Sequence, residues 1–238
     1  MDQFREKVTK ALRISVWSAA IDWVAEFKEL LVEPYVFMFG SDPWPAGVTT
    51  LQLYAPVDLT KNPELAKLVL RWRDALSSVP VTLVEDQWLH ITLEAITDKP
   101  AGEISPAERS ELVEAVREAL KDVPAYSGTA GSCLAYLSGA IVDISPAQPL
   151  LELHRILRRA VHFVRGPGST AYQPSKPHMS LGYATKTVNS DPIQRQLRKI
   201  DPNNAPLYLS EVQLVEISID QQDSRLEWET VAKFDLVR

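Results

Sequence analysis

Two short segments of the chain share a pattern that could carry out acid–base chemistry. Residues 90–93 read His-Ile-Thr-Leu and residues 178–181 read His-Met-Ser-Leu, so the two segments use two of the four histidines in the chain. Imidazole is the side chain best suited to exchange protons near neutral pH, because its ordinary pKa is about 6.5. A pair of such rings could act as base and acid in one reaction, while the hydroxyl groups donate hydrogen bonds to a negatively charged substrate.

Both segments lie in stretches whose apolar alternation predicts β-strands. Side chains two positions apart on a strand share a face and lie about 6–7 Å apart. We therefore expect His90 to project with Thr92, and His178 with Ser180, while the apolar residues between them face a core. One such tripeptide arises often by chance. Two copies in similar strands indicate a shared site to which both strands contribute.

The elements around these strands alternate between strand and helix patterns, as in an α+β or α/β chain. A β-α-β pattern occurs twice, and each copy ends in one of the two histidine strands. Ser105 and Pro106 are typical of a helix start, as N-cap and first helical residue. Strands are predicted at residues 49–55, 88–96, 126–136, 139–144, 178–183, 207–219 and 225–237, and helices at 62–76, from Ser105-Pro106 to Leu120, at 149–164 and at 192–200.

The N-terminal residues differ from the rest. Residues 2–31 predict one amphipathic helix, because apolar residues recur at spacings of three, four or seven. Prolines at positions 34, 43 and 45 then indicate a connection at about residues 33–48. We divide the chain into residues 1–48 and a main domain at 49–238. The helix could bind a partner, a membrane surface, a second copy of the chain, or its own domain.

Composition narrows the class of protein. The 238 residues are 45% hydrophobic and 24% charged, which is ordinary for a globular chain. The single cysteine, Cys133, excludes an internal disulfide framework and a thiolate-rich zinc site. A net charge of -6 argues against binding of long nucleic acids. No stretch of about 20 apolar residues and no signal peptide occurs, so we expect a cytoplasmic protein without a membrane anchor.

The two motifs resemble those of the two-histidine (2H) phosphoesterase superfamily, and most closely the bacterial proteins called 2′–5′ RNA ligase-like or cyclic phosphodiesterases. The resemblance covers roughly residues 49–237, including Trp88-Leu89 before the first motif and Gly182-Tyr183-Ala184 after the second. It implies an α+β, bilobal fold: two pseudo-symmetric antiparallel-sheet lobes with helices outside and a central cleft. It also implies metal-independent hydrolysis or formation of 2′,3′-cyclic phosphate or 2′–5′ phosphodiester bonds in RNA ends or small nucleotides, without a cofactor.

With this resemblance, His90 and His178 become the expected acid and base, without an assignment of which is which. Thr92 and Ser180 would hold the non-bridging phosphate oxygens. Further residues on the predicted strands, or in the loop before the second motif, are candidates for substrate binding. These are Trp88, Lys176, Tyr183, Tyr54 and Tyr172.

Several of these candidates have a plainer interpretation. Trp88 shares the parity of His90 and could stack on a nucleobase, or it could be a core residue. Lys176 could attract phosphate, or it could be a solvated lysine. By the two-residue alternation of a strand, the side chain of Tyr183 faces the core, but a bulge beside Gly182 would turn it outward. Glu94 shares the parity of His90 and could raise the pKa of a nearby imidazole, or it could lie beyond the cleft-facing part of the strand.

Two other functions are compatible with the sequence. Glu94 and the acidic balance suggest a non-catalytic RNA- or nucleotide-binding module that uses the same cleft. The amphipathic helix at residues 2–31 suggests an interaction scaffold.

Overall fold

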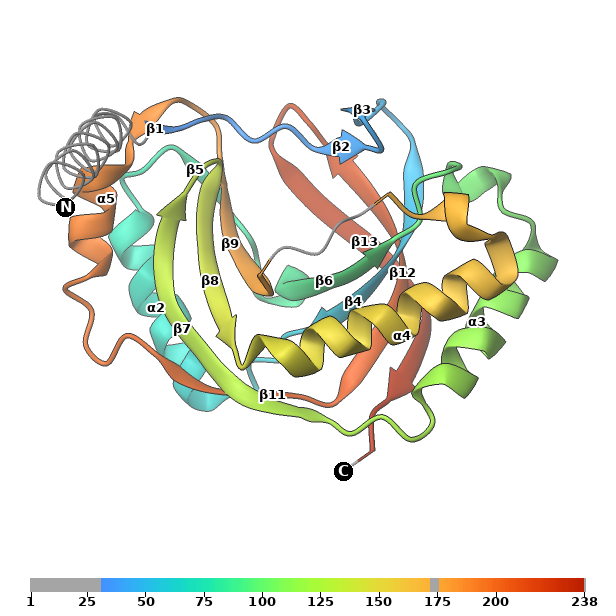
Figure 1. The fold of residues 1–238 in the computed structure, drawn as a ribbon. Helices are drawn as coiled ribbons and strands as arrows, with labels where there is room; N and C mark the ends of the chain where they lie inside the picture. The colour runs from blue at the N-terminus through green and yellow to red at the C-terminus, as the bar shows by residue number, and fades with distance from the viewer. Residues whose placement is uncertain (1–30, 172–175, 238) are drawn as a thin grey trace, which may run out of the picture. The chain divides into compact units, whose positions relative to one another are not determined.

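A computed structural model describes residues 31–171 and 176–237 of the chain (Figure 1). Residues Val32–Arg238 form one compact unit, which includes the segment at 33–48. The helix predicted at residues 2–31 and the candidate Tyr172 lie outside the described residues, apart from Leu31 at the end of that range. None of the described helices is both long enough and apolar enough to cross a bilayer.

Two antiparallel sheets form the framework. The four-stranded sheet has the order β13 (Arg225–Asp235), β12 (Glu211–Asp220), β4 (Thr49–Pro56), β6 (His90–Ala95). The five-stranded sheet has the order β11 (Ala205–Leu209), β7 (Tyr126–Tyr136), β8 (Gly139–Ser145), β9 (His178–Ala184), β5 (Val81–Leu83). The short strands are β1 (Leu31–Val32), β2 (Met38–Phe39), β3 (Asp42–Pro43) and β10 (Val188–Asn189).

Helices cover the outer face of each sheet, and one continuous apolar core lies between the helices and the sheets. The helix α2 (Pro63–Leu76) packs against β11, and α5 (Ser190–Leu197) packs against β7 and α2. The helix α4 (Ala147–Arg165) packs against β6 and against α3 (Pro106–Leu120), which also contacts β13. Figure 1 shows the two helix pairs at opposite sides of the sheets. Single 3₁₀ turns lie at η2 (Asp86–Trp88), η3 (Ala101–Glu103) and η4 (Pro167–Ser169).

The chain passes from one sheet to the other several times. The helix α2 follows a strand of the four-stranded sheet but packs on the five-stranded sheet. The helix α4 follows β8 of the five-stranded sheet but packs on β6 of the four-stranded sheet. The predicted α+β fold with two antiparallel-sheet lobes is confirmed, and the lobes are interlocked by these exchanges.

Most predicted elements are confirmed to within a few residues. The helix α3 starts as expected, with Pro106 in its first turn and the backbone N–H of Glu108 donating to the hydroxyl of Ser105 at 3.2 Å. Two predictions were wrong. Trp88 lies in the 3₁₀ turn η2 rather than in the strand, which begins at His90. The strand predicted at 207–219 is two strands, because the chain leaves one sheet at Ser210 and enters the other.

Candidate active site

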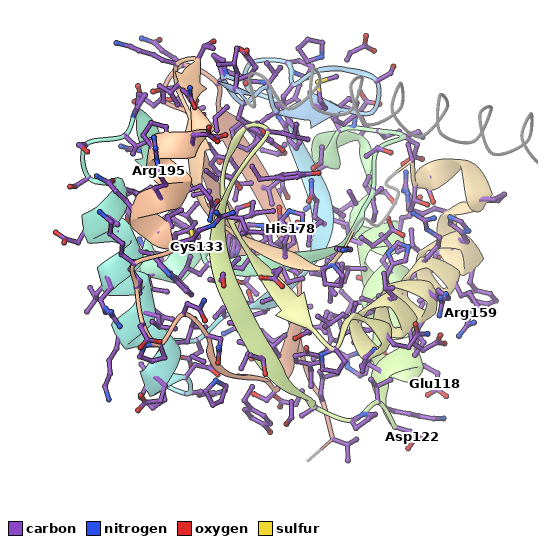
Figure 2. The ribbon with its side chains drawn as sticks, turned by 60° about the vertical axis from the view of Figure 1, so that its left-hand side comes forward. Glu118, Asp122, Cys133, Arg159, His178 and Arg195 are labelled. Atoms are coloured by element: carbon purple, nitrogen blue, oxygen red, sulfur yellow. The ribbon has the colours of Figure 1, made fainter. Side chains whose placement is uncertain are left out.

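The two histidines and the two hydroxyl residues line one cavity between the inner faces of the sheets. The cavity has a volume of about 330 Å³, and His90, Thr92, His178 and Ser180 all contribute to its wall. His90 begins β6 and His178 begins β9, one strand in each sheet. Figure 2 shows His178 among the side chains at the centre of the molecule, whereas Arg159 lies on the outer face of α4. The structure therefore brings the four sequence-predicted residues together.

Each imidazole is held in the same way by its own strand. Nδ1 of His90 lies 2.8 Å from the carbonyl oxygen of Trp88, and Nδ1 of His178 lies 3.0 Å from the carbonyl oxygen of Lys176. A carbonyl oxygen only accepts hydrogen bonds, so Nδ1 must carry the proton in both rings. In the neutral form this leaves Nε2 with its lone pair, ready to accept a proton. The two lobes thus present their imidazoles with the same tautomer.

The surroundings of the two rings differ. Tyr54 stacks on His90 with 3.9 Å between ring centroids and 18° between ring planes, and Trp228 packs edge-on at 5.2 Å. His90 is only 5% exposed. Burial lowers the pKa of His90 to about 4; the hydrogen bond to the Trp88 carbonyl opposes this, and the charge of nearby His178 adds to it. His178 is only half-buried. At neutral pH, the imidazole of His90 is therefore uncharged.

A β-bulge in β6 changes the expected position of Glu94. Tyr54 of β4 lies opposite Thr92, but Leu53 lies opposite Glu94, so Leu93 is an extra residue in the ladder. Because a one-residue bulge reverses the alternation beyond it, Glu94 turns away from the cavity. The prediction that Glu94 shares the face of His90 was wrong.

Glu94 instead forms a buried ion pair behind the strand. The guanidinium Nε of Arg158, on α4, donates to Oε2 of Glu94 at 2.6 Å, and the backbone N–H of Ala95 donates to Oε1 at 2.9 Å. The side chain of Glu94 is fully buried, and His154 lies 3.6 Å from the same carboxylate. Glu94 therefore places no charge in the cavity, and it is not among the causes of the lowered pKa of His90. Of the two reasons for the interpretation as a binding module without catalysis, Glu94 and the acidic balance, the first no longer holds.

A second bulge lies at the matching place in β9. Ile141 of β8 lies opposite Ser180, but Ala140 lies opposite Gly182, so the residue after the hydroxyl is again the extra one. The bulge turns Tyr183 into the cavity, as the alternative interpretation of its parity expected. Its hydroxyl is hydrogen-bonded to Ser180, and burial raises its pKa. The two histidine strands are thus alike in tautomer, in hydroxyl spacing and in bulge.

The remaining candidates differ in position. Tyr54 lines the cavity, but one face of its ring is covered by His90. Trp88 packs against Trp228, with 4.7 Å between ring centroids, and lies outside the lining of the cavity. The side chain of Lys176 is exposed and also outside this lining, while its backbone carbonyl orients His178.

Comparison with known proteins identifies the family. A family model described as "2'-5' RNA ligase superfamily" matches residues 62–221 and includes both histidine motifs. The chain belongs to this superfamily. Membership supports a phosphoesterase activity. A search of curated proteins gave no significant match.

Solved structures share the superfamily fold. A protein described as a phosphoesterase has 18% identity and a TM-score of 0.57, with 80% of this chain and 99% of that chain covered. E. coli LigT in complex with 3'-AMP has 18% identity, a TM-score of 0.58 and the same coverage. The protein TT0787 of Thermus thermophilus has 14% identity and a TM-score of 0.56, with 79% and 97% covered. About a fifth of this chain has no counterpart in these structures.

A segment that the sequence analysis treated as a connection forms one wall of the cavity. Residues 33–44, which we call the strap, lie before the part of the chain matched by the superfamily, and Tyr35, Phe37 and Trp44 line the cavity from it. A signal was present, because aromatic residues alternate at positions 35, 37 and 39 as in a strand with one buried face. Trp228, which helps to bury His90, was not predicted from the sequence as a site residue.

The described residues that line the cavity include no lysine, arginine, aspartate or glutamate. Hydrogen-bonding groups in the lining are the two imidazoles, the amide of Gln52, and the hydroxyl groups of Thr92, Thr97, Ser180 and three tyrosines, Tyr35, Tyr54 and Tyr183. Aromatic and aliphatic side chains make up most of the remaining wall. A mostly apolar wall with a few hydrogen-bonding groups is common in sites for small molecules.

Proposed function

We propose that this chain is a metal-independent phosphodiesterase that opens 2′,3′-cyclic phosphates, or hydrolyses or forms 2′–5′ phosphodiester bonds, in RNA ends or small nucleotides. The observation that carries this proposal is the single cavity lined by two imidazoles from different sheets, each with its Nδ1 bound to a carbonyl. The chemistry needs one group to take a proton from the attacking oxygen and another to give a proton to the departing oxygen.

The different surroundings of the histidines suggest their roles. Nε2 of the uncharged His90 removes a proton from water, whose oxygen forms a bond to phosphorus. The bond from phosphorus to one ribose oxygen breaks, and His178, which for this step carries a proton on Nε2 as well as on Nδ1, donates the Nε2 proton to that oxygen. Thr92 and Ser180 donate hydrogen bonds to the non-bridging oxygens, where negative charge increases in the transition state. When a 2′–5′ bond is formed from a 2′,3′-cyclic phosphate, a ribose hydroxyl takes the place of water as the attacking group, and the same bond from phosphorus to a ribose oxygen of the cyclic phosphate breaks.

Two further observations support the proposal. E. coli LigT has been crystallised with 3'-AMP and with phosphate, and the fold of this chain is similar to it. The single cysteine, Cys133, is buried and free, which is compatible with the cytoplasmic location that we propose.

The test is hydrolysis of a nucleoside 2′,3′-cyclic phosphate in the presence of EDTA. We expect His90→Ala and His178→Ala each to lower kcat at least about 10²-fold, the usual contribution of acid–base catalysis. His162→Ala is the matched control, because His162 hydrogen-bonds to Thr170 at 2.7 Å and does not line the cavity. Full activity in both cavity variants would refute the proposal. Saturable nucleotide binding without product at any pH would favour a binding module instead.

A further inference from the structure

The strap closes one side of the cavity and is attached to both lobes. The backbone N–H of Tyr35 donates to the carbonyl oxygen of Ala184, at the end of β9, at 2.9 Å. The side-chain amide of Gln221, between β12 and β13, donates to the carbonyl oxygen of Phe37 at 2.9 Å. Figure 1 shows this segment, in blue, running from the end of β9 to β2 along the edge of both sheets. The strap is therefore a fixed wall that bridges the two sheets.

The strap adds an aromatic surface to the cavity. The ring centroids of Tyr35, Phe37 and Tyr183 lie 4.6 to 4.8 Å from one another, which makes a compact three-ring cluster. Phe37 is only 4% exposed, whereas Tyr35 is partly exposed and lines the cavity. Tyr183 lies beyond the bulge in β9, so the cluster joins the strap to the strand that carries His178. An aromatic face of this kind can stack on a nucleobase.

The size and charge of the cavity limit what can bind. A volume of about 330 Å³ is at the lower end of the range of about 300–1,000 Å³ for small-molecule sites. A polynucleotide needs a groove that continues past the reacting phosphate, and it needs cations for its additional phosphates. The strap closes one side of this cavity, and no lysine or arginine occurs among the described residues that line it.

We propose that the strap restricts the two-histidine site to substrates of the size of one nucleotide with a single phosphodiester charge. The substrate class is a mononucleoside cyclic phosphate, with its base stacked on the cluster of Tyr35 and Tyr183. A polynucleotide that ends in the same cyclic phosphate is excluded. This inference rests on the proposed function and selects one of the substrate classes that the proposed function leaves open.

The experiment compares two substrates with the same reacting group. One is a mononucleoside 2′,3′-cyclic phosphate, and the other is a ten-residue oligoribonucleotide that ends in that nucleoside and its cyclic phosphate. The values of kcat/KM are measured for the full chain and for Tyr35→Ala and Phe37→Ala. Val36→Ala is the matched control, because Val36 lies in the strap but is 51% exposed and does not line the cavity.

We expect the unchanged protein to prefer the mononucleotide at least about 100-fold. Loss of the stacking ring in Tyr35→Ala should raise KM for the mononucleotide about tenfold, with kcat nearly unchanged. Phe37→Ala should lower the preference at least about tenfold by opening the wall, and Val36→Ala should leave it unchanged. Equal use of both substrates by the unchanged protein would overturn the inference while leaving the proposed function intact.

A binding measurement separates the two hypotheses when turnover is absent. The mononucleoside 3′-phosphate and the oligoribonucleotide 3′-phosphate are titrated into the full chain by calorimetry. Binding of the mononucleoside 3′-phosphate without binding of the oligoribonucleotide supports the size restriction, even if neither cyclic phosphate is hydrolysed. Absence of hydrolysis would refute only the proposed function. Equal binding of both would refute the size restriction.

Discussion

Burial of His90 under Tyr54 predicts a specific effect on the pH dependence of activity. The ring of Tyr54 stacks on the imidazole at 3.9 Å, and desolvation is the main cause that holds the pKa of His90 at about 4. Replacing Tyr54 with alanine admits water to one face of the imidazole. We therefore expect the pKa of His90 to rise from about 4 towards its ordinary value of 6.5 in Tyr54→Ala.

The size of the effect follows from the fraction of His90 that is uncharged. At pH 5, a base with a pKa of 4 is about 90% uncharged, whereas a base with a pKa of 6.5 is about 3% uncharged. Full recovery of the ordinary pKa in Tyr54→Ala would thus lower kcat/KM at pH 5 by about 30-fold through protonation alone. At pH 8 the base is almost fully uncharged in both proteins, so protonation causes almost no difference there.

The assay is kcat/KM for a 2′,3′-cyclic phosphate from pH 4 to 9, together with an NMR titration of the histidine ring protons. The titration reports the pKa of His90 directly and does not depend on turnover. Tyr126→Ala is the control, because Tyr126 is also buried but belongs to the core outside the cavity. The explanation fails if the low-pH limb of the kcat/KM profile of the unchanged protein lies near pH 6.5. It also fails if this limb has the same position in Tyr54→Ala.

Three further predictions concern stability. Glu94→Gln leaves the Arg158 guanidinium without its carboxylate and should lower the free energy of unfolding, measured in urea, by about 3 kcal/mol. It should not shift the low-pH limb of the kcat/KM profile. A shifted limb would contradict the orientation of Glu94 away from the cavity. Because the pKa of His90 is lowered in the folded protein, the imidazole takes up a proton in the unfolded chain at a higher pH than in the folded chain. Stability is therefore unaffected by this group above about pH 6.5, and about 2–3 kcal/mol of the free energy of unfolding is lost by pH 4.5. His90→Asn should remove this part of the pH dependence of stability, and an unchanged dependence in that variant would count against the prediction. A Cβ atom at Gly139 would overlap the backbone carbonyl oxygen of Gly182 in β9, so Gly139→Ala should lower the free energy of unfolding by more than about 2 kcal/mol, while Gly102→Ala, in open space, should change it little; equal stability of the two variants would show that β8 and β9 can separate without cost.

The central residues of the site could be predicted from the sequence because their spacing is local. His90 and Thr92 share a face by the two-residue period of a strand, and the same is true of His178 and Ser180. Each pair lies before the bulge in its strand, where the period still holds. The helix start at Ser105 was also predictable, because an N-cap depends on side-chain chemistry within one turn.

Features that depend on pairing between distant segments could not be predicted in this way. The bulge that turns Glu94 outward is defined by the register between β4 and β6, and the residues of β6 carry no sign of it. In β9, Gly182 offered a hint, and the orientation of Tyr183 was accordingly anticipated as an alternative. The strap was missed because its prolines indicate a connection and say nothing about what the connection lies against.

The exchange of elements between the sheets has a consequence for how this molecule can be divided. Each lobe is assembled from several stretches of sequence that are separated by stretches belonging to the other, and the strand pair β11–β12 changes sheet within a single residue. No cut in the chain therefore releases one complete half. The protein should melt in one calorimetric transition, and fragments that end between the two histidine motifs should fail to fold separately, despite the internal symmetry that makes each half look like a module.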